Sequence, residues 1–367
     1  MKNEMLNIVI PIKKCIRKIT GYKKPIIKDN TFLVWEACSK SHSEVVPGFA
    51  KYLLDLGYHV SVLLNPERYD EGLFSRFNEE NISFNKLTRV QAEKFFKHAD
   101  LSAVKGVLVT TVGKICDCVH YDGAYEYFND TLDRSKLLCV EHDLRHSVDA
   151  GTWNENLIML REPNYKGAKA VVVNPHFFGN VNITPKNDDI TNFITIGAIR
   201  DNKKNNELII DAVKTLHDRG YSNFKLTVVG RGNLKGIPKE LHQYFEITGR
   251  LPFDKMYEKL EKADFMLTSY NEEHHIRYKT TGTSGNFQLV YGFLKPCVIA
   301  ESFAPINGFN SENSVLYKSD DEYVDALEKC INMSSQEYKN IQDNLKVYVD
   351  NLYNLSKENL KRLINER

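Results

Sequence analysis

The segment Thr281–Asn286, which reads TGTSGN, has the residue types to bind an anionic group. Apolar residues at helical spacing follow it, namely Phe287, Val290, Tyr291 and Leu294. The first N–H groups of a helix have no partner within the helix, and the helix dipole makes that end partly positive. Thr283, Ser284, Gly285 and Asn286 are therefore predicted to hold a phosphate or a carboxylate. An ordinary helix cap with permissive glycines is the alternative.

Basic loops follow three predicted strands of the same half of the chain. They contain Arg200 with Lys203 and Lys204, Gly230-Arg231-Gly232, and Gly249-Arg250. The carboxyl ends of parallel strands meet at one edge of a sheet, where ligands bind. A single Arg or Lys in such a place is typical of a solvated loop. Three basic loops that converge on a helix start instead favour a nucleoside-diphosphate ligand.

The first half of the chain also carries polar residues at strand ends. Leu137 to Glu141 reads as a buried strand, and it delivers His142 and Asp143 to the sheet edge. His146 is a nearby alternative. The segment Ser41–Glu44, which includes His42 and Ser43, follows an earlier strand in the same way.

The elements that carry these residues alternate between strands and helices, which predicts parallel, doubly wound sheets. Strands are expected at 31–35, 58–64, 82–87, 107–112, 137–141, 157–160, 170–173, 193–199, 224–229, 246–248, 265–268, 297–300 and 315–317. Helices are expected near 47–56, 67–78, 89–99, 122–134, 206–219, 253–263 and 286–294. Prolines and asparagines over 174–192 interrupt the alternation, so two α/β domains are predicted. The expected division is a basic amphipathic segment at 1–28, a first Rossmann-like domain at 29–178, a linker at 179–192, a second Rossmann-like domain at 193–333 and C-terminal helices at 334–367.

Composition excludes several classes of protein. A net charge of +1 argues against a nucleic-acid binder, and seven scattered cysteines indicate reduced thiols in a cytoplasmic protein. No apolar run is long enough to span a bilayer, and no cleavage-like site follows the N-terminus. Lys13, Lys14, Arg17 and Lys18 lie in an amphipathic segment, which favours peripheral contact with an anionic membrane. A helix packed on its own domain is the alternative.

Residues 193–301 resemble the donor-binding domain of two-Rossmann (GT-B) glycosyltransferases, and most of all the family-4-like sugar transferases of bacterial polysaccharide assembly. The resemblance lies in FITIGAIRDNKKNNELIIDAV, FKLTVVGRGN, ITGRLPFDKMYEKLEKADFMLTSY and the helix start that leads to KPCVIA. It implies that Arg200 and Lys204 hold the donor phosphates, with Lys203 as a rival for the second place. It also matches Gly230 and Gly249 to the family's glycines. The family often presents a His or His-Asp to the sugar, which implies a catalytic role for His142 and Asp143, either orienting the sugar or shuttling a proton.

The chain departs from that family at two glutamates eight positions apart. Their places fall on Thr281 and on Leu289, or on Gln288 with a slip of one residue. The crowded loop at 272–279 is expected to replace them, with His275 at the donor. Metal binding by His274 and His275 is disfavoured because adjacent histidines on one loop rarely face one ion, so no metal or other cofactor is expected.

The loop His42-Ser43-Glu44 lacks the family's glycine pair and is assigned to acceptor or phosphate contact. Glu44 or His42 would serve as the base if the reaction inverts configuration. The resemblance instead favours retention. The predicted function is transfer of a hexose or related sugar from a nucleotide sugar to a growing, lipid-linked glycan, as in capsule or lipopolysaccharide synthesis. A nucleotide-sugar epimerase and a non-catalytic nucleotide-sugar-binding subunit are the alternatives. A dinucleotide oxidoreductase is disfavoured because the G-x-G-x-x-G fingerprint is absent.

Overall fold

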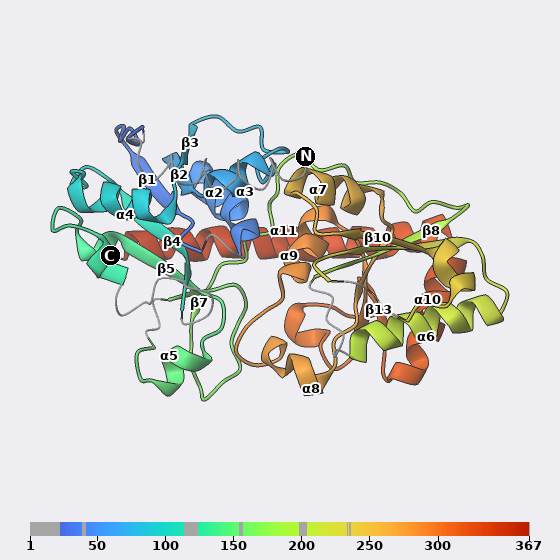
Figure 1. Cartoon of the computed structure of the whole chain (residues 1–367). Helices are drawn as coiled ribbons and strands as arrows, with labels where there is room; N and C mark the ends of the chain where they lie inside the picture. Colours follow the sequence, from blue (N-terminus) through green and yellow to red (C-terminus); the bar gives the residue numbers. More distant parts are fainter. Residues whose placement is uncertain are drawn as a thin grey trace.

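The protein folds into two α/β domains that lie side by side (Figure 1). This computed structural model describes residues 23–38, 42–113, 124–153, 157–197, 204–232, 234 and 236–366. The basic positions from Lys13 to Lys18 lie outside the described residues, so the predicted membrane-binding segment stays a prediction. No helix in the described part of the chain is long and apolar enough to cross a membrane.

The first domain contains a seven-stranded, all-parallel sheet with the strand order β3-β2-β1-β4-β5-β6-β7. Its strands are β1 (Thr31–Trp35), β2 (His59–Leu64), β3 (Ile82–Lys86), β4 (Gly106–Val112), β5 (Leu137–Glu141), β6 (Ile158–Met159) and β7 (Val171–Val172). Its helices are α2 (Val46–Asp55), α3 (Pro66–Asp70), α4 (Arg89–His98) and α5 (Arg145–Asp149). Every residue of β1, β4 and β5 is buried, as expected for strands covered on both faces.

The second domain repeats this plan in a six-stranded parallel sheet with the order β10-β9-β8-β11-β12-β13. Its strands are β8 (Thr191–Ile196), β9 (Phe224–Val229), β10 (Phe245–Gly249), β11 (Phe265–Thr268), β12 (Cys297–Ala300) and β13 (Val315–Tyr317). Its helices are α6 (Lys204–Asp218), α7 (Phe253–Lys262), α8 (Glu272–His275), α9 (Gly285–Phe293) and α10 (Asp320–Asn332). In both sheets the chain order reverses beside the first strand, and ligands of doubly wound sheets bind at that point.

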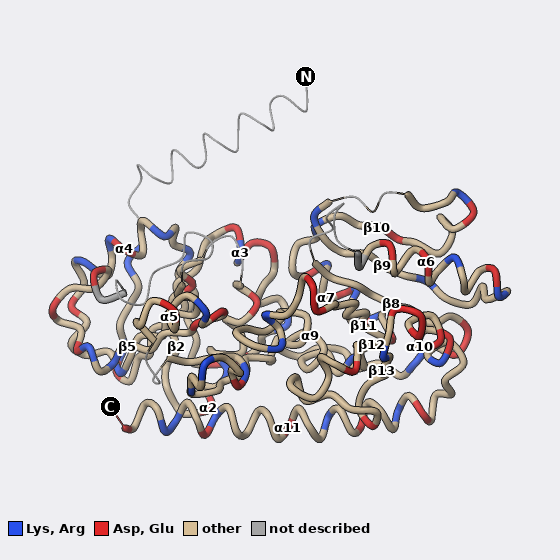
Figure 2. The backbone as a smooth tube through the Cα atoms, turned by 90° about the horizontal axis from the view of Figure 1, so that it is seen from below, with Lys and Arg blue, Asp and Glu red and all other residues tan. Residues whose placement is uncertain are grey.

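A single C-terminal helix, α11 (Ser335–Asn365), joins the two domains along one side of the molecule (Figure 2). Its N-terminal half packs on the second domain, where Tyr338 donates a hydrogen bond to the carbonyl of Asp264 at 2.9 Å. Its last turns return to the first domain, where Leu360 and Leu363 enter the core beneath β1 and β2. Ser356 also accepts a hydrogen bond from the backbone of Asn174 at 3.0 Å. Figure 2 also shows Lys and Arg positions interspersed with Asp and Glu positions along the backbone of both domains, in keeping with the small net charge.

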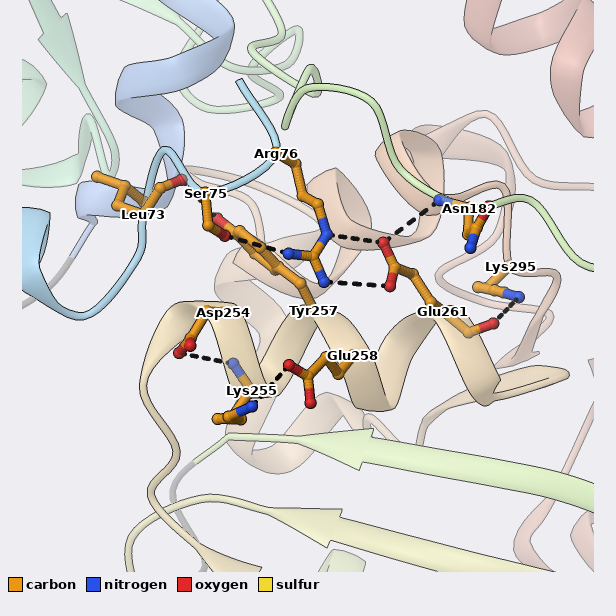
Figure 3. A network of polar contacts seen from close by, with 10 residues as sticks. All are labelled: Leu73, Ser75, Arg76, Asn182, Asp254, Lys255, Tyr257, Glu258, Glu261 and Lys295. Atoms are coloured by element: carbon orange, nitrogen blue, oxygen red, sulfur yellow. Dashed lines mark hydrogen bonds and ion pairs between the residues drawn. The ribbon is translucent and has the colours of Figure 1, made fainter. Parts of the chain in front are cut away.

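The two domains also contact each other where α7 meets the segment after α3 (Figure 3). Arg76 donates to both carboxylate oxygens of Glu261, at 3.0 and 3.2 Å. The buried hydroxyl of Tyr257 donates to the carbonyl of Leu73 at 3.3 Å. Beside them, Lys295 is fully buried and donates to the carbonyl of Glu261 at 3.0 Å, and burial lowers its pKa to about 8. These bonds fix how the two sheet edges face one another.

The predicted fold class, two doubly wound α/β domains with a helical C-terminal extension, is confirmed. Two predicted helices were wrong in extent. The pattern at 67–78 forms a short helix at Pro66–Asp70 followed by turns, and the described part of 122–134 forms only short 3-10 turns.

Candidate donor and catalytic site

A pocket opens at the carboxyl edge of the second sheet, between the ends of β8, β9 and β11 and the start of α9. Its described lining consists of Thr195, Ile196, Gly197, Asn206, Ile209, Val228, Val229, Leu234, Leu267, Thr268, Ser269, Tyr270, His275, Tyr278, Ser284 and Asn286. None of these described residues is a lysine, arginine, aspartate or glutamate. The pocket thus offers aromatic and aliphatic walls with hydroxyl and amide groups, which suits a base and ribose better than a charged peptide.

The start of α9 is held rigidly at the mouth of this pocket. Ser284 is the N-cap, and its hydroxyl accepts a hydrogen bond from the backbone of Asn286 at 3.3 Å. The hydroxyl of Tyr270 lies 2.6 Å from that of Ser284. The Asn286 amide donates to Tyr270 at 2.9 Å and to the carbonyl of Ile196 at 3.0 Å. One side chain therefore ties the end of β8 to the first turn of α9, which fixes the position of the partly positive end of that helix.

In the first domain, His142 and Asp143 directly follow the buried strand β5, as predicted. The His142 Nε2 lies 3.0 Å from the carbonyl oxygen of Thr110, which can only accept. Nε2 therefore carries the proton, and Nδ1 of the neutral ring is left as an acceptor. Burial, followed by the neighbouring His42 ring, lowers the pKa of His142 far below its usual value.

The loop that follows β1 brings its predicted residues to the same place. The rings of His42 and His142 have centroids 4.3 Å apart, and desolvation lowers the pKa of His42 to about 4. Ser43 is buried, whereas Glu44 keeps part of its surface exposed. Protein atoms surround the Glu44 carboxyl, and this desolvation raises its pKa. His42, Glu44 and His142 thus form one polar group on the first domain.

Hydrogen bonds join the first domain, beside this group, to the loop before α9 in the second domain. We call these hydrogen bonds the clasp. Asp143 and Gly282 form an antiparallel bridge, and the backbone of Leu144 donates to the carbonyl of Thr281 at 3.0 Å. Arg161, buried after β6, donates to the Gly282 carbonyl from Nε at 3.2 Å and from Nη2 at 2.7 Å. Desolvation lowers the pKa of Arg161 to about 10. The clasp places the predicted His-Asp pair beside the predicted phosphate-binding helix start.

The structure places the remaining predicted donor residues in different ways. Arg200 and Lys203 lie outside the described residues, and so does the side chain of Lys204, whose backbone begins α6. Arg250 forms a two-pronged ion pair with Glu71 of the first domain, at 2.8 and 2.7 Å. His275 is buried against the pocket and stacks on Tyr278, with ring centroids 5.7 Å apart.

The two predicted glycines have different structural roles. At Gly230 a Cβ atom would lie 1.6 Å from the carbonyl oxygen of Gly197, so only glycine fits beside the pocket rim. Gly249 instead has a φ of +68° with open space around it, so it serves the turn after β10. Thr283 lies between the clasp and the N-cap.

Sequence reasoning overlooked two residues that support the site. Arg161 follows a correctly predicted strand, so its position at the carboxyl edge was the available signal. Glu141 is the last residue of β5, and its carboxylate accepts a hydrogen bond from the Ser147 hydroxyl at 2.9 Å. Burial raises the pKa of Glu141 to about 7. Glu141 supports the loop that carries His142, and Arg161 supports the Gly282 backbone that bridges to Asp143.

Comparisons with known proteins agree with this geometry. Residues 191–332 match the protein family described as "Glycosyl transferases group 1". The family match covers the second domain of the chain, and the pocket and the α9 start lie within it.

Solved structures of glycosyltransferases with the GT-B fold share the fold of this chain over nearly its whole length. The apo form of the lipopolysaccharide outer core galactosyltransferase WaaB is 13% identical, covers 92% of this chain and 99% of its own, and has a TM-score of 0.52. The α,α-trehalose 6-phosphate synthase of Burkholderia multivorans is 8% identical, with coverages of 92% and 99% and a TM-score of 0.50. An E. coli trehalose-6-phosphate structure bound with UDP-2-fluoro glucose is 9% identical, with coverages of 91% and 99% and a TM-score of 0.51. No curated protein sequence matches the chain significantly.

Proposed function

We propose that this protein is a glycosyltransferase that moves a hexose or related sugar from a nucleoside-diphosphate sugar to a growing, lipid-linked glycan of a cell-surface polysaccharide, with retention of configuration. The observation that carries the proposal is the clasp, because it sets the His142–Asp143 loop directly against the helix start beside the pocket. A donor whose base lies in the pocket would then present its diphosphate to α9 and its sugar to His142.

The donor class is supported by the lining of the pocket and by one structural neighbour. Tyr270, Tyr278 and the ends of β8 and β9 offer flat apolar walls for a base, and Ser284 and Asn286 lie at the α9 start, where the partly positive helix end would face a diphosphate. The neighbour bound with UDP-2-fluoro glucose holds a nucleotide sugar in the same overall fold. In the proposal, Arg200 and Lys204 add positive charge as the diphosphate leaves, so protein groups perform the role that a metal ion has in other transferases.

His142 has the chemistry of a hydrogen-bond acceptor. Its Nε2–H is engaged by the Thr110 carbonyl, and its lowered pKa makes Nδ1 a weak base. We therefore assign His142 to a hydroxyl of the donor sugar, which it would orient, and not to a proton shuttle. Asp143, fixed by the bridge to Gly282, would hold the adjoining edge of the sugar site.

The proposed acceptor and the proposed membrane contact rest on one structural neighbour and on the basic N-terminal segment. WaaB acts in the lipopolysaccharide outer core, and this likeness motivates a lipid-linked glycan acceptor. The acceptor would approach along His42, Ser43 and Glu44. The basic segment at 1–28 would rest on the cytoplasmic face of an anionic membrane. Changing Lys13, Lys14, Arg17 and Lys18 to Glu should abolish co-sedimentation with anionic vesicles, and unchanged co-sedimentation would refute the membrane contact.

A panel of radiolabelled nucleotide sugars, incubated with the full chain and no acceptor, tests the proposed reaction. A transferase leaks slowly to water, so one donor should release free sugar and nucleoside diphosphate, with the rate unchanged by EDTA. A sugar that is interconverted while still attached to the nucleotide would indicate an epimerase. Binding without turnover would indicate a silent binding subunit. Either result would overturn the proposal.

A further inference from the structure

The donor pocket as described cannot supply a charged group to the hydroxyls of a transferred sugar. Its described lining has no acidic side chain, and Thr281 and Gln288, at places where the family would carry glutamates, are fully buried. The Thr281 hydroxyl and both polar atoms of the Gln288 amide lack a hydrogen-bond partner among the described residues. They point into protein, so they cannot replace a carboxylate at the site.

A carboxylate does reach the α9 start, but from the other domain. A Cβ atom added at Gly285, the first residue of α9, would lie 2.9 Å from Oε1 of Glu44. Glu44 therefore touches the turn whose N–H groups are proposed to bind the diphosphate. Unlike the neighbouring Ser43, Glu44 keeps part of its residue surface exposed.

Several neighbours hold Glu44 in this position. It lies in the short helix at Ser43–Val45, which continues into α2, so its backbone is anchored to the first domain. Electrostatic attraction from the Arg68 guanidinium acts on its carboxylate. Arg68 is fixed in turn by Glu71, at 2.6 Å. The carboxylate thus stands between the helix start and the imidazole that faces the sugar.

We propose that Glu44 accepts hydrogen bonds from hydroxyl groups of the donor sugar, so that the first domain supplies the carboxylate that the donor domain lacks. The inference rests on the proposed function and reassigns Glu44 from the acceptor side to the sugar end of the donor. A carboxylate is an effective acceptor for a pair of neighbouring hydroxyls because it offers two oxygens in one plane. Sugar recognition would then require both domains, and a donor would bind fully only when the clasp is closed.

Calorimetric titration of the full chain tests this assignment with the donor that the panel identifies and with its nucleoside diphosphate alone. Glu44→Gln should weaken binding of the nucleotide sugar by about 10-fold or more, the effect of losing a hydrogen bond to a charged group, and leave the nucleoside diphosphate within about two-fold. Glu80→Gln, which changes an exposed carboxylate elsewhere on the first domain, should alter neither affinity. Donors lacking one hydroxyl provide a second readout. The analogue that lacks the contacted hydroxyl should bind wild type and Glu44→Gln equally.

Three outcomes would overturn the inference. Equal losses for the two ligands would show that Glu44 only supports the fold. Tighter binding of the nucleoside diphosphate by Glu44→Gln, with no loss for the sugar donor, would show that Glu44 merely repels phosphate. Unchanged donor affinity with a lower transfer rate would return Glu44 to the acceptor. If wild type binds no nucleotide sugar at all, the proposed function itself fails, whatever the variant does.

Discussion

Replacing Asn286 with Asp exchanges an amide for a carboxylate of nearly the same size at the start of α9. The amide nitrogen donates to the Ile196 carbonyl and to the Tyr270 hydroxyl, at 3.0 and 2.9 Å. The Tyr270 hydroxyl can turn to donate to the new carboxylate, whereas the Ile196 carbonyl can only accept. One hydrogen bond is therefore lost and an oxygen–oxygen repulsion is created, so the free energy of unfolding should fall by about 1–3 kcal/mol.

The effect of this substitution on ligand binding should be larger. A carboxylate about 5 Å from a phosphate charge, at an effective dielectric constant of about 20, costs about 3 kcal/mol, which is more than 100-fold in affinity. Asn286→Ala removes the same hydrogen bonds without adding charge, so it should weaken diphosphate binding by about 10-fold or less. Calorimetric titration with a nucleoside diphosphate and with the uncharged nucleoside, together with urea unfolding, separates the two effects. The reasoning is refuted if both variants bind the diphosphate equally well, or if the nucleoside loses as much affinity as the diphosphate.

Three further predictions concern the scaffold. Gly230→Ala should lower both the free energy of unfolding and the nucleotide affinity, because the new Cβ would meet a backbone carbonyl that cannot give way. Gly249→Ala should cost only about 1 kcal/mol of backbone strain. Equal melting temperatures for the two variants would contradict this prediction. A double-mutant cycle on Arg76→Ala and Glu261→Ala should give a coupling free energy of about 1 kcal/mol in urea unfolding, because the ion pair is two-pronged and mostly shielded from water. A coupling free energy of zero would show that this ion pair contributes nothing to domain packing. Burial lowers the pKa of His176 to about 4, so below pH 6.5 the unfolded chain binds more protons than the folded chain, and stability falls as the pH drops towards 4. His176→Asn should reduce the slope of unfolding free energy against pH in this range by the equivalent of about one proton. An unchanged slope would refute this prediction.

The strands could be predicted well from the sequence because a parallel strand buried on both faces is a local signal. Leu137–Glu141 and Phe224–Val229 are short apolar runs that end at polar residues, and both were predicted with their observed bounds. The helix predicted at 67–78 ends early because Gly72, directly after the C-cap Glu71, takes the left-handed conformation that terminates a helix. This glycine was a local signal that the apolar spacing outweighed. A Cβ at Gly72 would also lie 2.7 Å from the Asp254 side chain on the other domain.

The positions of the site residues could be predicted better from the sequence than their contacts across the domain boundary. The positions of His142 and Ser284 follow from strand ends and helix starts, which the sequence shows directly. The contact of Glu44 with Gly285 and the bonds from Arg161 to Gly282 join distant parts of the chain across a domain boundary. Such contacts depend on how the two sheets face each other, and this is set by α11 and by the Arg76–Glu261 pair.

A crystal structure of the full chain with an unreactive nucleotide sugar, such as a 2-fluoro analogue of the donor chosen by the panel, tests the central claim most directly. The diphosphate should lie at the first turn of α9, within hydrogen-bonding distance of its backbone N–H groups and of Arg200 and Lys204. The sugar should lie between that turn and Nδ1 of His142. A diphosphate bound elsewhere in the cleft, or an Arg200 side chain that points away from it, would contradict the account.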